Sequence, residues 1–355
     1  MKKDITIVKV GSNTIVDEKG AVRTDIIRDI IVALQKIIRD GGRVVLVTSG
    51  AVRLGRISLG QSASAAVAAS IGQIHLFDAY YQEAKKVKQE LAQFLLTRPY
   101  IVTRKYFLNL QSTFDTLLDQ GILPIVNEND ALVAHTEWSF GDNDSLAAAL
   151  AISLKAERLI ILSHIDGLFD IDPDKNKNTK LIKVVRDVNA ELLKYCSPKA
   201  SAGGRGGMLS KLKAARLVTA VGIEAHIING SVLGNLEKVL QSQEIGTTFL
   251  PRKSSGEISN RDRWLLAAKN SAGSIEIDSG AVTALKNGKS LLAVGVKNVN
   301  GQFNKKEIVE IVDKENRGVA FGIVDYSSAE INDMLRTNRV KDVQLMHTDN
   351  MIKIH

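Results

Sequence analysis

Residues 5–10 read ITIVKV, and Gly11 and Ser12 follow them directly. A short β-branched run that ends at a glycine is typical of a buried strand, and the glycine starts the turn behind it. Similar runs that end in Gly, Asn, Asp or Ser recur further along: RVVLVTSG (43–50), ILPIVNEND (122–130), RLIILSHIDG (158–167) and AHIING (225–230). These runs predict a β-sheet at the centre of the fold.

Segments of helical length separate these runs. Between residues 26 and 38, isoleucine and leucine recur at helical spacing, and Gly41-Gly42 end the pattern. Strands that are apolar on both faces and alternate with helices form parallel sheets that helices cover on both sides. The sequence therefore predicts an α/β fold, a three-layer αβα sandwich around a mostly parallel sheet. Ligands of such sheets bind beyond the carboxyl ends of the strands.

The pattern changes after Pro251. Residues 252–263 are polar and charged, as in a linker, and a short helix is expected from Trp264 to Lys269. From Gly273 onward, SIEID, SLLAVGVKNV, EIVEIVD and GVAFGIVDY alternate at strand period between Gly or Asn turns. We therefore expect three parts: an α/β domain (1–252), a linker (253–270) and a small β-barrel-like domain (271–355).

The composition is that of a globular protein. A chain of 355 residues exceeds the size at which one hydrophobic core usually keeps growing, so two domains are expected. Apolar residues make up 45% and charged residues 24%, which argues against disorder. The single cysteine, Cys196, excludes an internal disulfide and fits a reducing compartment. Since neither a signal peptide nor a membrane span is evident, we expect a soluble, cytoplasmic protein.

The formal net charge is +8, and the excess lies in residues 1–270. From Ser271 onward, 11 Lys and Arg side chains balance 11 Asp and Glu side chains. The excess is interspersed with acids rather than gathered into long runs. An anionic small substrate accounts for it as well as a polynucleotide does, so the charge leaves both classes of partner open.

Two polar residues stand at the ends of the first two predicted strands. Lys9 interrupts an apolar run, so it is either an edge residue that reaches solvent or a cation over a bound anion. The glycine behind it matters because a backbone without Cβ can approach a phosphate closely. Ser49 occupies the same place after the second run, where an ordinary helix cap is the simpler interpretation.

Two clusters of Asn and Asp give a stronger signal. They lie in VNENDALVA (126–134) and GDNDSLAAALA (141–151). Caps and turns can use one or two such side chains, but buried carboxylates and amides are costly unless paired, so packing does not explain them all. A helix that begins at Asn143 or Asp144 presents free amide groups and a positive dipole end to an anionic group.

A glycine-rich loop lies in SAGGRGGMLSKLKAA (201–215). It resembles a phosphate cradle, but this loop lacks the Gly-Lys-Ser/Thr triplet of a Walker A motif, and a flexible linker is equally open. The loop leads into an amphipathic helix whose first turn carries Ser210 and Lys211, a position suited to a phosphate.

These features together favour phosphoryl transfer. Two lysines far apart in the sequence, a glycine loop and Asn/Asp clusters occur without an evident catalytic base. Such a site needs an acceptor that is already nucleophilic, and a carboxylate is ionised at neutral pH. Catalysis then consists mainly of alignment and of neutralising charge on the moving phosphoryl group.

The same segments resemble the amino-acid kinase family. VKVGSNTIV, VLVTSGAV, LLTR, FLN, LPIVNENDAL, FGDNDSLAAALA, DGLFDIDP and GGRGGMLSKLKAA occur in the family's order and at its spacing. SIEIDSGAVTALKNGKSLLAVGV and FNKKEIVEIV resemble the PUA domain that many members carry. The resemblance covers nearly the whole chain and implies the amino-acid kinase fold for residues 1–252 and a PUA domain for residues 271–355.

The resemblance also implies an activity. This activity is ATP-dependent phosphorylation of the side-chain carboxylate of L-glutamate to glutamyl 5-phosphate, the first step of proline biosynthesis. Lys9 and Lys211 match the two lysines that stabilise the phosphoryl group, and Asp144 matches the aspartate that holds them in place, which makes these three residues the catalytic candidates. The positions that match the glutamate-binding residues of the family are Ser49, Asp130 and Asn143.

The implied ATP site departs in part from the family pattern. Ser163-His164 stand where relatives usually have Thr-Asp, Arg205 and Ser210 replace threonines, and Arg53 replaces a smaller residue. We therefore expect the nucleotide contacts to differ more than the glutamate contacts. Mg2+ would arrive with ATP, and no residue is assigned as a metal ligand. The positions that match the ATP site are Lys9, Ser163, His164, Arg205, Gly206, Gly207, Met208, Leu209, Ser210 and Lys211.

The resemblance further implies proline as a feedback inhibitor and a homo-oligomer, a dimer or tetramer. Two alternatives stay open from the sequence. The first is an amino-acid kinase that acts on another carboxylate or phosphate acceptor. The second is an RNA-binding protein that acts through its PUA domain, although the neutral charge balance from residue 271 onward opposes it.

Overall fold

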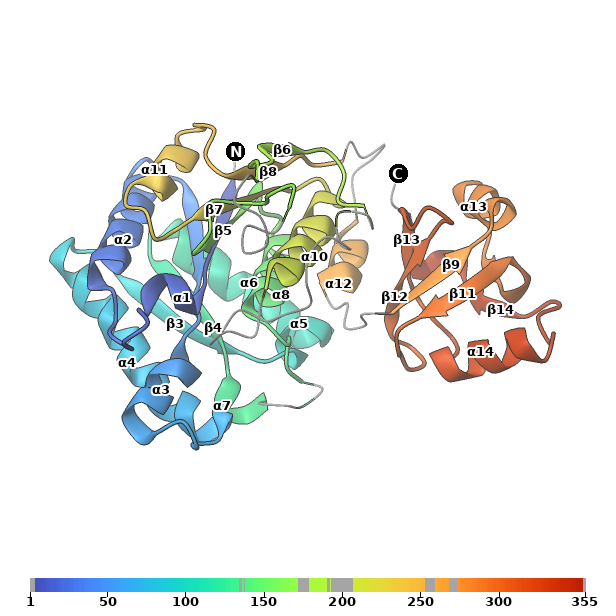
Figure 1. The fold of residues 1–355 in the computed structure, drawn as a ribbon, viewed down its shortest axis with the longest axis horizontal. Helices are drawn as coiled ribbons and strands as arrows, with labels where there is room; N and C mark the ends of the chain where they lie inside the picture. The colour runs from blue at the N-terminus through green and yellow to red at the C-terminus, as the bar shows by residue number, and fades with distance from the viewer. Residues whose placement is uncertain are drawn as a thin grey trace. The chain divides into compact units, whose positions relative to one another are not determined.

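The computed structural model describes residues 4–133, 136, 138–171, 179–189, 192, 207–252, 259–267 and 273–353. The chain forms two compact units, and the main division falls between Pro251 and Arg252. The larger unit combines helices with a large sheet, and the smaller unit has sheets of its own (Figure 1). This division lies next to the end of the first domain that we predicted. The boundaries 1–252, 253–270 and 271–355 stay our proposal.

An eight-stranded sheet forms the centre of the larger unit. Its strands are β1 (Ile5–Val10), β2 (Arg43–Val47), β3 (Leu91–Leu96), β4 (Leu123–Glu128), β5 (Arg158–Ser163), β6 (Val184–Val185), β7 (Glu224–Asn229) and β8 (Thr247–Phe249). They lie in the order β3-β4-β2-β1-β5-β7-β8-β6. Only the β7–β8 pair is antiparallel among these neighbours. The carboxyl ends of β1, β2, β4, β5 and β7 therefore meet at one edge.

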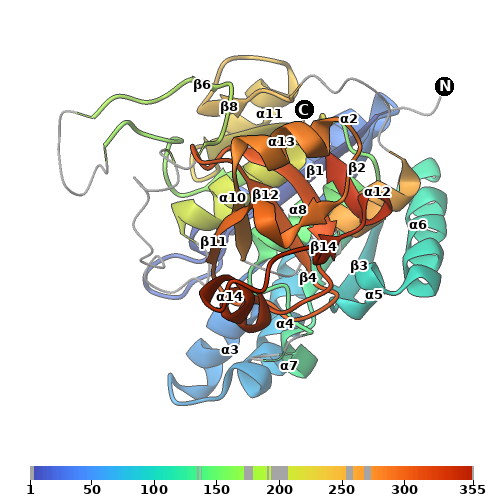
Figure 2. The same ribbon diagram turned by 90° about the vertical axis from the view of Figure 1, so that its right-hand side faces the viewer.

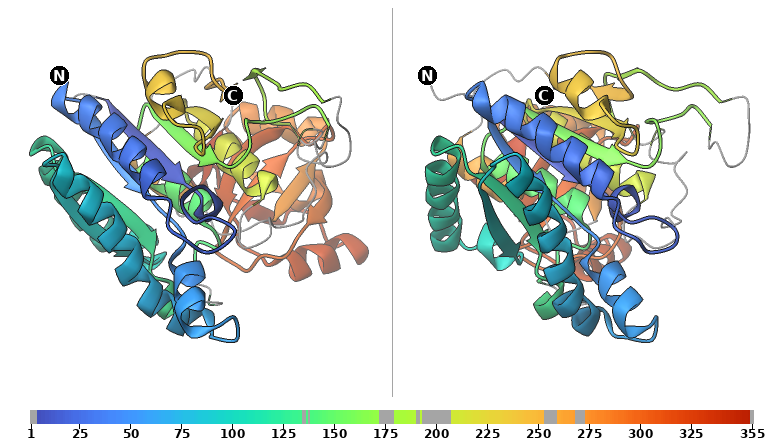
Figure 3. Two further views of the ribbon diagram at one scale, coloured as in Figure 1. Left: turned by 60° about the vertical axis from the view of Figure 1, so that its left-hand side comes forward. Right: turned by 90° about the vertical axis from the view of Figure 1, so that its left-hand side faces the viewer.

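Helices cover both faces of this sheet. They are α1 (Ser12–Ile15), α2 (Thr24–Arg39), α3 (Ala51–Leu59), α4 (Ala65–Lys86), α5 (Pro99–Val102), α6 (Arg104–Asp119), α7 (Asp130–Val133), α8 (Asn143–Ser153), α10 (Met208–Thr219) and α11 (Asn235–Leu240). Helices α2, α4 and α11 pack on one face, where α2 (blue) and α4 (cyan) lie in front of the sheet in Figure 3. Helices α6, α8 and α10 pack on the other. The predicted three-layer sandwich is confirmed.

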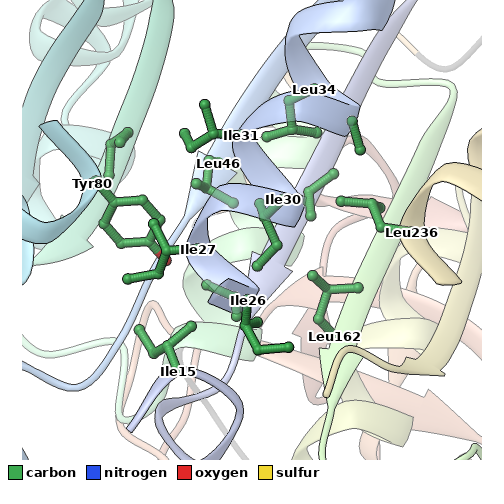
Figure 4. Close-up of a cluster of buried hydrophobic side chains, with 14 of the residues drawn as sticks. Ile15, Ile26, Ile27, Ile30, Ile31, Leu34, Leu46, Tyr80, Leu162 and Leu236 are labelled. Atoms are coloured by element: carbon green, nitrogen blue, oxygen red, sulfur yellow. The ribbon is translucent and has the colours of Figure 1, made fainter. Parts of the chain in front are cut away.

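Helix α2 supplies much of the core on its side of the sheet. Ile26, Ile27, Ile30, Ile31 and Leu34 are at most 1% exposed and contact the strands (Figure 4). Fully burying each such side chain stabilises the fold by about 1.5–3 kcal/mol. The helix ends as the sequence predicts: the glycine after its C-cap has φ +78° and donates its N–H to a carbonyl of the last turn.

The alternation of side chains along β1 places Lys9. Val8 and Val10 belong to the core cluster that contains α2, so the odd-numbered residues point to the opposite face. Ile7 and Lys9 therefore face the layer of α8, which contacts β1. The lysine is only 5% exposed, so it is not an edge residue that reaches solvent.

Helices α3 and α4 touch backbone to backbone. A Cβ atom added at Gly72 would lie 1.9 Å from the carbonyl oxygen of Ala51, and one at Gly55 would lie 1.8 Å from that of Ala68. Gly50 precedes α3 and has φ +114°, a conformation that favours glycine. Because Ala51 is the first residue of α3, this contact fixes the turn that carries Ser49.

The smaller unit has two sheets and its own hydrophobic core. Its five-stranded sheet has the order β11-β9-β12-β13-β15, and β10 pairs with β14. Figure 2 labels β11, β12 and β14 of these strands. The strands are β9 (Ser274–Ile277), β10 (Leu291–Leu292), β11 (Val296–Asn300), β12 (Ile308–Val312), β13 (Gly318–Ile323), β14 (Gln344–Met346) and β15 (Met351–Lys353). The predicted β domain is confirmed.

Helical segments in this unit exceed what the strand pattern predicts. They are α12 (Asn260–Ala267), α13 (Ser279–Lys286), α14 (Ser328–Arg336) and the 3-10 turns η1 (Ala293–Gly295) and η2 (Thr348–Asn350). Helix α12 overlaps the short helix expected at Trp264–Lys269 but begins earlier. The run SLLAVGVKNV forms two strands separated by η1 rather than one, because the strand pairing shifts from β14 to β9 along it.

Candidate active site

The order of the sheet creates the crevice in which the predicted residues meet. The chain builds β2, β3 and β4 on one side of β1, and then crosses through α8 to β5 on the other side. Ligands of open α/β sheets bind beyond the carboxyl ends of the strands where the order reverses. Helix α8 contacts β1, β2, β4 and β5, so its beginning lies at this reversal.

Three charged side chains meet beside the end of β1. The Nζ of Lys9 lies 2.7 Å from Oδ1 of Asp144, and the Nζ of Lys211 lies 3.1 Å from Oδ2. The first lysine comes from β1, the aspartate from the first turn of α8 and the second lysine from the first turn of α10. The structure thus brings together the three residues that we predicted as catalytic, although 202 positions separate the two lysines.

The charges of this cluster stabilise one another. Asp144 has no exposed surface, and Lys9 and Lys211 are at most 7% exposed. Burial alone would raise the pKa of Asp144, but the two ammonium groups hold it below its ordinary value. Burial lowers the pKa of Lys9 from its ordinary value, and the Asp144 carboxylate counteracts that effect. One net positive charge is left in the cluster.

The start of α10 adds a neutral donor to the cluster. The hydroxyl oxygen of Ser210 lies 2.7 Å from Oδ2 of Asp144 and 2.9 Å from the carbonyl oxygen of Gly207, so two acceptors share its one proton. Gly207 is the N-cap residue, so the free amide groups of Met208 and Leu209 lie at this end of the helix. Of the predicted ATP positions in the glycine loop, Arg205 and Gly206 lie outside the described residues.

The start of α8 carries the Asp/Asn run. Asp142 caps the helix by accepting from the backbone N–H of Ser145 at 2.7 Å, and burial and the Asp144 charge raise its pKa. Asn143 donates its side-chain amide to Oδ1 of Asn127 at 3.0 Å. Its own Oδ1 is buried and has no hydrogen-bond partner in the described part of the chain. The three polar side chains of the run therefore have three different environments.

The structure places the other two predicted glutamate-binding residues on neighbouring strands. Ser49 lies just beyond the end of β2. Its hydroxyl donates to the carbonyl of Val10 at 2.8 Å, so a hydrogen bond connects it to the end of β1. Asp130 opens α7 directly behind β4 and is 9% exposed. Both residues lie at the carboxyl edge of the sheet, behind two paired strands.

Ser163 lies on the other side of β1, at the end of β5. Its hydroxyl is buried and has no hydrogen-bond partner among the described residues. Leu162 pairs with Val10, so this hydroxyl lies close to the turn behind β1. His164 follows at an exposed position. An unsatisfied buried hydroxyl at the strand end is a suitable donor to a phosphate or ribose oxygen.

Arg53 links α3 to the segment that follows β1 through hydrogen bonds. Its guanidinium donates to Oδ1 of Asn13 at 2.8 Å and to the carbonyl of Asp17. The side chain therefore holds the segment that follows Gly11 against α3. Arg53 stands where the family pattern has a smaller residue. Its longer side chain reaches Asn13 and the carbonyl of Asp17.

Two residues next to Asn143 were not predicted as site residues. Asn127 is the penultimate residue of β4 and is 1% exposed, and its side-chain amide donates to Oε1 of Gln73 at 2.8 Å. The VNEND motif contains Asn127, so the polar cluster was a usable signal for it. Gln73 lies in the middle of α4, where a glutamine is ordinary, and the sequence alone offers no signal.

The described residues hold neither a metal cluster nor a membrane helix. No three of their His, Cys, Asp and Glu side chains lie together in a way that would hold a metal ion. Every helix in the described part of the chain is too short or too polar to cross a lipid bilayer.

This geometry defines a phosphotransferase-type α/β site, and comparison with known proteins specifies the family. A family model described as "Amino acid kinase family" matches residues 4–229, and a model described as "PUA domain" matches residues 273–344. The chain belongs to the amino acid kinase family.

Similar proteins cover nearly the full length of the chain. A glutamate 5-kinase from Geobacter metallireducens is 36% identical over 93% of this chain and 89% of its own length. One from Pelagibacter ubique is 34% identical over 99% and 98%, respectively. A carbamate kinase from Giardia lamblia bound to AMP-PNP has a TM-score of 0.51 at 18% identity, covering 70% of this chain and 99% of its own. A UMP kinase from Bacillus anthracis has a TM-score of 0.50 at 16% identity, covering 71% and 98%. These two structures share the fold.

Proposed function

We propose that this protein phosphorylates the side-chain carboxylate of L-glutamate with ATP and forms glutamyl 5-phosphate. The observation that carries the proposal is the buried Asp144 carboxylate between the ammonium groups of Lys9 and Lys211. This cluster lies at the sheet edge of an amino acid kinase fold. Relatives of about the same length are named glutamate 5-kinase, which supports glutamate rather than another acceptor.

The two lysines neutralise the charge that moves during transfer. In phosphoryl transfer, negative charge spreads over the equatorial oxygens of the migrating group and over the leaving oxygen. Ammonium groups that approach from β1 and from α10 can stabilise this charge from two directions. Asp144 touches both amines, so it fixes their positions and offsets their mutual repulsion. Ser210 orients the same carboxylate. Preorganised charges of this kind act most strongly in a buried site.

The acceptor needs no general base. The side-chain carboxylate of glutamate has an unperturbed pKa of about 4.3, so it is ionised at neutral pH. The protein's task is then to place one carboxylate oxygen in line with the γ-phosphorus of ATP. We assign this positioning to Ser49, Asp130 and Asn143, which lie on the β2 and β4 side of β1.

The nucleotide belongs on the β5 and β7 side. The buried Ser163 hydroxyl and the amide groups at the start of α10 are donors suited to phosphate oxygens. His164 and the segment that includes Arg205 and Gly206 complete the proposed ATP site. Both carboxylate oxygens of Asp144 already have partners, so we propose that Mg2+ enters on the ATP phosphates. There it would neutralise phosphate charge.

Three further features belong to the same proposal. Proline would act as a feedback inhibitor, and the chain would form a homo-oligomer, a dimer or tetramer. The single cysteine supports the cytoplasm as its compartment. RNA binding through the PUA domain is not favoured, since its 11 basic and 11 acidic side chains balance.

An acceptor panel tests the proposed function. Purified protein with MgATP would receive L-glutamate, N-acetyl-L-glutamate, L-aspartate, carbamate or UMP in separate reactions. ADP release would be followed, and hydroxylamine would trap any acyl phosphate. We expect ADP release with a hydroxamate product for L-glutamate above all other acceptors. Turnover with only a different acceptor would overturn the assignment.

A further inference from the structure

Gln73 lies at an unusual place on α4. The inward face of this helix is apolar around Leu76, and the Tyr80 hydroxyl accepts a hydrogen bond from Thr48 at 3.0 Å. Two turns before Tyr80, Gln73 reaches the end of β4, where its Oε1 accepts from the Asn127 side-chain amide at 2.8 Å. The neighbouring Gly72 lies against the α3 backbone, so close helix packing fixes the position of α4 at this point.

A backbone group fixes the orientation of the Asn127 amide. The N–H of Glu128 can only donate, and it donates to Oδ1 of Asn127 at 2.9 Å. The opposite end of the Asn127 amide is therefore its NH2 group. That group needs an acceptor, because an unpaired buried donor is costly, and Oε1 of Gln73 is its acceptor.

The orientation of the Asn127 amide determines the orientation of the Asn143 amide. Since Oδ1 of Asn127 is an acceptor, Asn143 must approach it with its NH2 group, and the two atoms lie 3.0 Å apart. Oδ1 of Asn143 consequently points away from Asn127. It is buried and has no partner among the described residues, so it is prepared to accept a hydrogen bond from a ligand.

We propose that Gln73 is a positioning residue that, through Asn127, aims the Asn143 carbonyl oxygen at the α-ammonium group of the acceptor. The inference rests on the proposed function in one respect, namely that the acceptor is L-glutamate. It explains selection of an amino acid over a plain dicarboxylate, because only the amino acid supplies a donor to Oδ1. A bound dicarboxylate without an ammonium group would leave Oδ1 of Asn143 buried and unpaired.

Two variants of Gln73 distinguish the effect of its hydrogen-bonding oxygen, Oε1, from the effect of its side-chain size. Gln73→Met keeps the length of the side chain but removes the acceptor for the Asn127 amide. Gln73→Glu keeps an oxygen acceptor at the same place. Gln82→Met is the matched control, because Gln82 is exposed on the same helix, where its side-chain amide donates to Asp78 one turn away.

Steady-state kinetics with two acceptors provide the readout. L-glutamate is compared with glutarate, which has both carboxylates but lacks the ammonium group. We expect Gln73→Met to raise KM for L-glutamate by roughly 5- to 30-fold, the equivalent of one unsatisfied buried group. KM for ATP and the kinetics with glutarate should change less than about twofold. Gln73→Glu should restore most of the loss, and Gln82→Met should match the unaltered protein.

Parallel losses with both acceptors, or an unchanged KM for L-glutamate, would overturn the proposal. A second measurement needs no substrate: 15N-asparagine labelling reports hydrogen exchange of side-chain amides. The Asn127 amide protons should exchange slowly in the unaltered protein and in Gln73→Glu, and rapidly in Gln73→Met. If the unaltered protein makes no hydroxamate from L-glutamate, the proposed function fails. Exchange that is equally fast in all three proteins would instead refute the role of Gln73.

Discussion

Asp144 is a charged side chain without exposed surface, and its partners make this possible. An unpaired buried carboxylate would be protonated, but here each oxygen has an ammonium neighbour and one also accepts from Ser210. The ion pairs are not a source of much stability, since desolvation of both partners offsets their attraction. Their effect is to hold two like charges at fixed positions beside the strand end.

Removing either ammonium group should mainly slow turnover. In Lys9→Met or Lys211→Met, the migrating phosphoryl group loses one of its two stabilising charges. We expect kcat to fall by roughly 10²- to 10³-fold, while KM for ATP and for L-glutamate changes much less. Steady-state kinetics with both substrates varied would show this. Variants that turn over normally and bind poorly would contradict the assigned roles.

The pH profile of Asp144→Asn tests how the cluster is held. The Asp144 carboxylate raises the pKa of Lys9 against the lowering effect of burial, so its loss should lower that pKa further. The Lys9 amine would then lose its proton at lower pH. We expect the alkaline limb of the kcat profile to shift to lower pH, with a large drop in kcat itself. A reduced kcat with an unshifted alkaline limb would show that Asp144 does not set the charge of Lys9.

At the scale of elements, the packing of α3 against α4 positions residues on the side of β1 where we propose that glutamate binds. Helices α3 and α4 approach closely enough that only glycine fits at residues 55 and 72. That contact fixes the beginning of α3, behind Ser49, and at the same time holds Gln73 at the end of β4. One helix pair thus positions both the turn that carries Ser49 and the side chain of Gln73.

Gly72→Ala should disturb stability and acceptor binding together. Its Cβ would lie 1.9 Å from the Ala51 carbonyl oxygen, so the two helices would have to separate. We expect a loss of about 1–3 kcal/mol in the free energy of unfolding and a raised KM for L-glutamate. Denaturant unfolding and kinetics would measure both. Ser70→Ala, at an exposed position of α4, is the control and should change stability by less than about 0.5 kcal/mol.

The sequence predicted five of the eight strands of the larger sheet, and helix α2, because their signals are local; β3, β6 and β8 were not predicted. β-branched runs that end in Gly or polar residues marked β1, β2, β4, β5 and β7, and the isoleucine period marked α2. Lys9, Asp144 and Lys211 were predicted from motif resemblance, and only the fold shows that they touch. Gln73 could not be predicted, because its role depends on a strand 54 positions further along the chain. Helices α13 and α14 lie between and after the alternating runs and were not predicted.

At the scale of the whole molecule, two hydrophobic cores lie in two units. Ile30 belongs to the cluster between α2 and the large sheet, and Ile311 belongs to the cluster of the smaller unit. Every described residue of the proposed site lies in the larger unit. The cores therefore contribute to stability separately, and only one of them supports the site directly.

Core substitutions in the two units should have different consequences. Ile30→Ala and Ile311→Ala each remove a fully buried side chain, so each should cost about 2–5 kcal/mol in the unit concerned. We expect calorimetry to resolve two transitions, with each variant lowering one of them. Saturating MgATP and L-glutamate should raise the transition that Ile30→Ala lowers. If the ligands raised only the transition that Ile311→Ala lowers, the site would belong to the smaller unit and the assignment would be wrong.

The central position of β1 has a consequence for biosynthesis. This strand is synthesised well before one of its two neighbours, β5, which begins only at Arg158. At typical translation rates, the ribosome needs on the order of ten seconds to deliver that neighbour. Until then, one row of N–H and C=O groups along β1 is open to pairing with other nascent chains. We therefore expect this edge of β1 to be open to wrong pairing until β5 arrives, unless a chaperone or a transient helix contact covers it.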